Sequence, residues 1–163
     1  MPGLQNFDYD IYATSKLFEG VIATNDPLRA ICCINTSGSP MTYGRFVKFE
    51  FENRTMSPLD GSGEISGFLA YKHSHEVVRD ANGNAQVEAD ESGDVYKTGS
   101  FTATAVTPIA NGDPVYVVDN PASPDNGRVG NASTPGGVLL ANARFESTRT
   151  TPGNVTIYIE NVG

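Results

Sequence analysis

The sequence predicts an all-β fold: a compact β-sandwich or β-barrel core with an extended N-terminal arm and long surface loops. In its clearest segments apolar and polar residues alternate, which is the period of strands that turn one face to a core. The chain of 163 residues contains 17 glycines and 10 prolines, as many short strands joined by turns require. No stretch of a dozen residues presents an apolar face at helical spacing without an interrupting glycine or proline.

The clearest strand candidate is the segment GRFVKFEFE at residues 44–52. Alternation places Val47, Phe49 and Phe51 on one face, opposite a mainly charged face that also carries Phe46. We therefore expect a half-buried strand whose charged face lies in water.

Two other segments alternate in the same way, FTATAV at 101–106 and VTIYIE at 155–160. Asn111-Gly112 predicts a tight turn, because both residues tolerate a positive φ, and PVYVV at 114–118 predicts the strand after it. The other strand candidates are short apolar runs between turn residues: 20–23, 30–34, 65–75, 95–97, 138–140 and 143–146.

The domain organisation follows from the length and from three unusual regions. We expect a single β domain at residues 19–163, with polar, turn-rich surface loops at 79–94 and 120–137. Residues 1–18 precede the first clear strand and form an N-terminal arm, which either folds back on its own domain or lies on a partner subunit. The candidate partner contacts are the large apolar side chains of the arm: Phe7, Tyr9, Ile11, Tyr12, Leu17 and Phe18.

The charge and hydropathy patterns argue against two classes of partner. Lys and Arg number 11 against 19 Asp and Glu, a net charge of -8, so we expect no nucleic acid partner. No apolar run reaches the roughly 18 to 20 residues that cross a bilayer, and the first residues lack the basic and apolar regions of a signal peptide. The sequence therefore predicts a protein made in the cytoplasm, with no membrane partner.

The two cysteines, Cys32 and Cys33, are adjacent in a candidate strand. Neighbouring strand residues point to opposite faces, so a disulfide between them would be strained. With no further cysteine to complete a thiolate metal site, we expect them to be small apolar side chains of the strand.

One segment invites a catalytic interpretation. Residues 67–75, GFLAYKHSH, resemble the opening of the first cupin motif, and His73 and His75 would share one strand face that could hold a metal. The Glu that this motif requires after the second His is missing, with Arg79 and Asp80 in that region, and no further histidine exists for the second motif. A cupin-like metal-dependent enzyme is therefore a minor alternative.

No other pattern indicates a catalytic, cofactor-binding or metal site. The chain lacks the G-x-S-x-G nucleophile turn and the G-x-x-x-x-G-K phosphate loop. The acidic loop at 88–94 lacks the spacing of an EF-hand. Nothing in the spacing of Tyr43, Tyr71 and Tyr96 indicates a sugar site either. We expect no enzyme activity, no cofactor and no metal.

The C-terminal half resembles the small capsid cement proteins of tailed bacteriophages. The resemblance lies in the order of five segments, which are GDVYKTG at 93–99, Thr107-Pro108-Ile109, GDPVYV at 112–117, LANARFEST at 140–148 and TPGNVTIYIENV at 151–162. These motifs consist of turn chemistry and alternating strands, and they contain no site.

The resemblance implies a structural virion protein that decorates the outer surface of the phage head. Such proteins commonly bind as trimers and stabilise contacts between major capsid subunits, so the implied partners are the major capsid protein and further copies in a homotrimer. A head-fibre or glycan-binding β domain is the main alternative, and an exposed tyrosine cluster would distinguish it. The cupin-like enzyme would instead retain metal at His73 and His75.

Overall fold

The computed structural model describes residues 30–71 and 77–162, and every regular element within these ranges is a β-strand. The predicted all-β fold is confirmed. The described residues contain no helix that is long and apolar enough to cross a membrane. The strands are β1 (Ala30–Asn35), β2 (Met41–Thr42), β3 (Arg45–Glu50), β4 (Thr55–Pro58), β5 (Gly67–Ala70), β6 (Val78–Arg79), β7 (Ala85–Val87), β8 (Ser92–Tyr96), β9 (Gly99–Ala105), β10 (Pro114–Val118), β11 (Val129–Gly130), β12 (Gly137–Phe145) and β13 (Gly153–Ile159).

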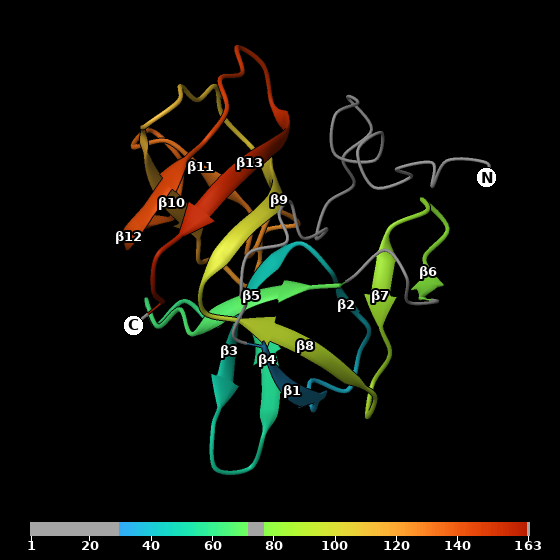
Figure 1. Ribbon diagram of the computed structural model, residues 1–163. Coiled ribbons are helices and arrows are strands. Elements are labelled where there is room, and N and C mark those ends of the chain that lie inside the picture. The colour runs from blue at the N-terminus through green and yellow to red at the C-terminus, as the bar shows by residue number, and fades with distance from the viewer. Residues whose placement is uncertain (1–29, 72–76, 163) are drawn as a thin grey trace, which may run out of the picture.

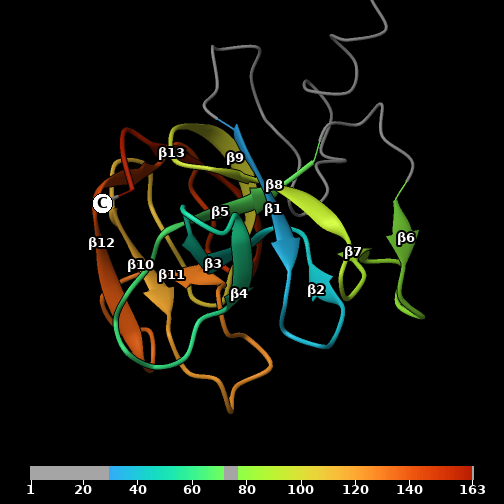
Figure 2. The ribbon, with the colours of Figure 1, turned by 90° about the horizontal axis from the view of Figure 1, so that it is seen from below.

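Most of these strands form two closed five-stranded barrels (Figure 1). The first barrel has the strand order β1-β4-β3-β5-β8, and the second has the order β10-β11-β9-β13-β12. The strands β2, β7 and β6 form a separate sheet in that order. Figures 1 and 2 show β6 and β7 at one side of the first barrel, away from the strands of the second.

Parts of the first barrel are buried on both faces, namely β5 and the adjoining ends of β3 and β8, because one face lines the barrel and the other packs toward the second barrel. On β5, Phe68 enters the core that joins the two barrels, whereas Leu69 enters the core inside the first barrel. Phe46 and Val47 of β3 divide in the same way. The expectation of a wet charged face was therefore wrong for Phe46, which is 1% exposed, while Phe51 lies beyond the end of β3 and is 71% exposed.

Aromatic rings fill the junction between the barrels. The ring centroid of Phe68 lies 5.0 Å from that of Phe46 and 5.1 Å from that of Phe101 in the second barrel. Tyr96 of β8 completes the group, with its ring 5.4 Å from Phe101. Tilted and edge-on aromatic pairs contribute a favourable interaction energy in addition to that from the apolar area they bury. The two barrels are thus joined by one packed core, which is distinct from the core inside the first barrel.

The second barrel matches its predicted strands closely. The inward faces of β9 and β13 are apolar as expected, although Thr102 of β9, expected in water, is also buried. The candidates at 138–140 and 143–146 are one strand, β12, which is interrupted at Asn142 (φ 61). The register with β10 shifts there: Val115 pairs with Leu140, whereas Pro114 pairs with Arg144. Because this bulge breaks the alternation of apolar and polar residues, the sequence predicted two strands in place of one.

Both predicted surface loops contain short strands. The region 79–94 includes β7 and the start of β8, with Ala85 and Val87 buried, and the region 120–137 includes β11 with Val129 buried. Strands of two or three residues are too short to show a period of two, so the polar composition concealed them. The candidate strand at 20–23 lies outside the described residues.

Candidate functional site

The residues that the sequence predicts as partner contacts, and the two candidate metal ligands, lie outside the described ranges. This applies to the histidines of the cupin-like segment, His73 and His75. It also applies to the six apolar residues of the arm: Phe7, Tyr9, Ile11, Tyr12, Leu17 and Phe18.

The acidic loop at 88–94 is held by a buried amide. The side chain of Asn35 is fully buried, and its Nδ2 donates to the carbonyl oxygens of Val87 (3.1 Å) and Glu88 (3.2 Å). Its backbone carbonyl accepts from the N–H of Asp90 at 2.9 Å. Within residues 30–71 and 77–162, no three acidic, His or Cys side chains are grouped to hold a metal ion. The loop conformation is therefore explained by hydrogen bonds to protein.

The two thiols occupy the opposite faces that strand geometry predicts. Cys32 is exposed and Cys33 is fully buried, and neither is in a disulfide. Burial, together with the neighbouring Cys32, raises the pKa of the Cys33 thiol to about 11. Because the thiolate is the nucleophilic form, Cys33 is an unreactive core side chain at neutral pH.

The three tyrosines considered for sugar binding are core residues. Tyr43, Tyr71 and Tyr96 are 8%, 3% and 1% exposed, and the rings of Tyr43 and Tyr71 pack 4.9 Å apart. Burial raises the pKa of Tyr43 and of Tyr96 to about 12, and the negative charge of Asp94 adds to both shifts. These tyrosines do not form the exposed platform that a glycan-binding domain needs.

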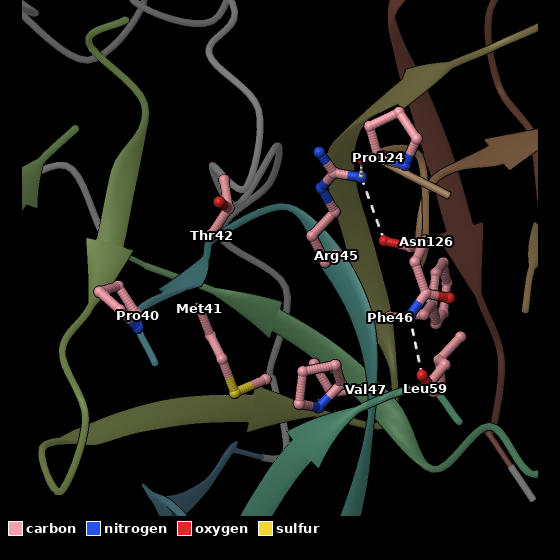
Figure 3. A pocket seen from close by; sticks show the side chains of 10 residues that line it. Pro40, Met41, Thr42, Arg45, Phe46, Val47, Leu59, Pro124 and Asn126 are labelled. Carbon is pink, nitrogen blue, oxygen red and sulfur yellow. Dashed lines mark hydrogen bonds between the residues drawn. The ribbon is translucent and has the colours of Figure 1, made fainter. Parts of the chain in front are cut away.

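A groove lies where the two barrels meet (Figure 3). The Arg45 side chain crosses it and donates to the carbonyl oxygens of Pro124 (3.2 Å) and Asn126 (3.1 Å) of the second barrel. The amide of Asn126 in turn donates to the Leu59 carbonyl at 2.8 Å. Polar groups at the base of the groove thus tie the barrels together, and no nucleophile with a neighbouring base is among its lining residues.

A second fastening is made by Asp119, at the end of β10. Asp119 is 9% exposed, and its carboxylate accepts the backbone N–H groups of Gly61 (2.7 Å) and Gly63 (2.6 Å), in the loop between β4 and β5. Sequence inspection did not single out Asp119 or Asn35. The available signal was an Asp or Asn at the end of an apolar run, in PVYVVD and AICCIN, but a run of this kind does not reveal the distant partners Val87 of Asn35 and Gly61 of Asp119.

The most exposed large apolar side chain of the described residues is Phe51, in the four-residue turn that joins β3 to β4. Ile34, Val78 and Leu139 are also more than two-fifths exposed. A single exposed apolar residue is common on soluble proteins, but an aromatic ring at the tip of a hairpin is a contact element of the kind found at interfaces. Phe51 is therefore the described apolar side chain most available for contact with another molecule.

Comparison with known proteins agrees with this picture. No curated protein matches the chain significantly. The solved capsid of Myoviridae phage XM1 contains a chain with a similar fold, at a TM-score of 0.69 and 22% identity, covering 92% of this chain and 94% of that one. The family model described as "Structural cement protein (E217 gp24/Pam3 gp6)" matches residues 4–160. The chain therefore belongs to the phage structural cement protein family and is a structural component of the virion.

Proposed function

We propose that the protein binds the outer surface of the assembled phage head as a decoration, or cement, protein and stabilises contacts between neighbouring major capsid subunits. The observation that carries the proposal is the family match over residues 4–160, which includes both barrels and the three-stranded sheet. Two closed barrels that share a core form a compact body suited to bridging two surfaces.

The stabilising mechanism is thermodynamic. A ligand that binds the assembled lattice, but not free subunits, stabilises the lattice by RT ln(1 + [L]/Kd) for each site. Many copies on one head add many such contributions. The protein then needs neither a catalytic residue nor a cofactor, only a surface complementary to the capsid.

The chemistry of the described residues supports a non-enzymatic role. The buried thiol of Cys33 is kept protonated, and the polar groups at the base of the junction groove are engaged in hydrogen bonds between the barrels. The arm at residues 1–18 is our proposed contact with partner subunits, through its apolar side chains.

We also propose that the protein self-associates as a homotrimer on the head and has no nucleic acid or membrane partner. The net charge of -8 opposes binding to a phosphate backbone. The separate sheet ends at β2 on one side and at β6 on the other, and contacts between copies would cover such edges. The site of action is the outer face of the virion, after synthesis in the host cytoplasm.

A sedimentation experiment tests the proposal. Purified protein is mixed with phage heads that lack it, and the heads are pelleted and analysed for bound protein. We expect saturable binding and a higher temperature of head disruption. Heads already saturated with the unlabelled protein are the control and should take up no labelled copies. Absence of binding at saturating concentration would overturn the proposed function.

A further inference from the structure

One end of the first barrel has an apolar mouth, defined here by Ala30, Ile31, Phe49, Phe51 and Lys97. Ala30, Ile31, Phe51 and Lys97 line a groove, and the Lys97 ammonium lies 5.2 Å from the ring centroid of Phe49. Ile31 and Phe49 pack partly on the core inside the barrel. The mouth is thus a continuation of the barrel core to the surface, with Phe51 as its most exposed member.

The hairpin that carries Phe51 is held in place at both ends. At the start of the turn, the Asn53 amide donates to the Glu50 carboxylate at 2.9 Å. At its end, Arg54 has a φ of 51, and its carbonyl oxygen accepts the Ile34 N–H of β1 at 2.8 Å. An aromatic side chain on a fixed turn loses little conformational freedom when it binds, which favours its use as an anchor.

The position of the hairpin favours contact with a partner. Figure 1 shows the β3–β4 turn at the lower end of the molecule, remote from the second barrel. Ala30, where the 29-residue N-terminal segment joins the described fold, lines the same groove as Phe51. A partner held by that segment is therefore brought to the mouth.

The charges around the mouth allow close approach. Among the described residues, Glu50 and Glu52 flank Phe51 in the sequence, and Arg54 of the same turn and Lys97 of the groove carry an equal number of positive charges. An exposed apolar patch with balanced charges allows an acidic protein to approach another surface with less electrostatic repulsion than its other faces would experience.

We propose that the apolar mouth is the face that docks on the major capsid protein, with Phe51 inserted into an apolar depression of that subunit. The inference rests on the proposed function and specifies which end of the molecule meets the head. Burial of the ring supplies binding energy, and the balanced charges at the rim restrict the orientation.

The test compares two single substitutions in the full chain, by quantitative binding to heads that lack the protein. Phe51→Ser removes the anchor, and Leu139→Ser, on β12 of the second barrel, is the matched control because Leu139 is 53% exposed. We expect Phe51→Ser to weaken binding by about 30-fold or more, as for a central aromatic contact. Leu139→Ser should change it less than about 2-fold, and Phe51→Tyr should retain most of the affinity, since its ring fills the same space.

Four outcomes would overturn the inference and leave the proposed function intact. The first is equal binding of wild type and Phe51→Ser; the second is a larger loss for Leu139→Ser. The third is unchanged head binding by Phe51→Ser together with a fall in its melting temperature well beyond the roughly 2 °C expected of a surface substitution. That result would mean that the Phe51 ring is covered by other residues of its own chain. The fourth is unchanged head binding by Phe51→Ser together with a lower molar mass than wild type in light scattering. That result would mean that the apolar mouth binds a second copy of this chain and not the capsid. Failure of the wild type to bind heads would instead overturn the proposed function, and the inference with it.

Discussion

Single residues at the junction of the barrels hold the molecule together through contacts that leave little room for substitution. Gly127 has a φ of 82, and a Cβ there would lie 2.6 Å from the carbonyl oxygen of Phe46. The carbonyl oxygen of Gly127 accepts the Phe46 N–H at 2.9 Å. Only glycine permits this approach of two backbones. Its neighbour Asn126 and the more distant Asp119 add side-chain bonds across the same junction.

Tyr96 gives this junction a measurable pH dependence. Its ordinary pKa near 10 is raised to about 12 by burial, with a further contribution from Asp94, so the folded state holds the phenol proton more tightly than the unfolded state does. The corresponding stability is complete below about pH 10 and is lost as the pH rises toward 12. We expect urea unfolding to show a smaller loss of stability between pH 8 and pH 11 for Tyr96→Phe than for wild type.

Cys33 and Tyr43 contribute in the same direction, because their pKa values are also raised, so the variant should keep part of the pH dependence. Identical slopes for wild type and Tyr96→Phe would contradict the assignment.

At the scale of strands, the alternation of apolar and polar residues predicted the positions of the strands well. It was less successful in predicting which strand faces are exposed to solvent. The strands β9, β10 and β13 follow their predicted ranges because their apolar positions point into one barrel. Strands with a core on each side do not alternate, and Phe68 and Leu69 of β5 are adjacent apolar residues for that reason. A period of two cannot be read from such segments, so the burial of Phe46 was missed.

The two faces of β5 can be tested separately. Phe68→Ala should cost about 3–5 kcal/mol and Leu69→Ala about 2–5 kcal/mol of unfolding free energy, because each leaves a cavity in a different core. Hydrogen exchange should locate the effects, with faster exchange in β9 for Phe68→Ala, since Phe101 loses its ring partner. Leu69→Ala should instead speed exchange in β7, whose Val87 shares the inner core. Leu139→Ala, at an exposed position, is the control for both. Acceleration of the same strands by both variants would contradict two separate cores.

At the scale of the molecule, the sequence predicted the class of fold and the family but not the pair of barrels. The motifs that resemble cement proteins begin at β8 and run to the end of β13, which includes the whole second barrel. Within it, β10 pairs with β11 and β12 with β13, neighbours in sequence, but β9 pairs with the distant β13. The first barrel closes by pairing Ala30 with Tyr96, distant residues whose proximity no local pattern reveals. A capsid-binding surface is still harder to recognise, because it requires shape complementarity and no particular residue type.

At the same scale, the proposed role of the N-terminal arm in attachment to the head can be tested by deletion. We expect deletion of residues 1–18 to weaken binding to heads far more than it lowers the melting temperature of the isolated protein, because an arm that lies on a partner contributes to attachment alone. Replacement by serine of Phe7, Tyr9, Ile11, Tyr12, Leu17 and Phe18 keeps the length of the arm and should reproduce the loss, which separates the apolar contacts from the tether. Head sedimentation and scanning calorimetry measure the two quantities on the same preparations. Proportional losses in both would show that the arm belongs to the core of its own subunit, and attachment would then rest on the described surface, with Phe51 at its centre.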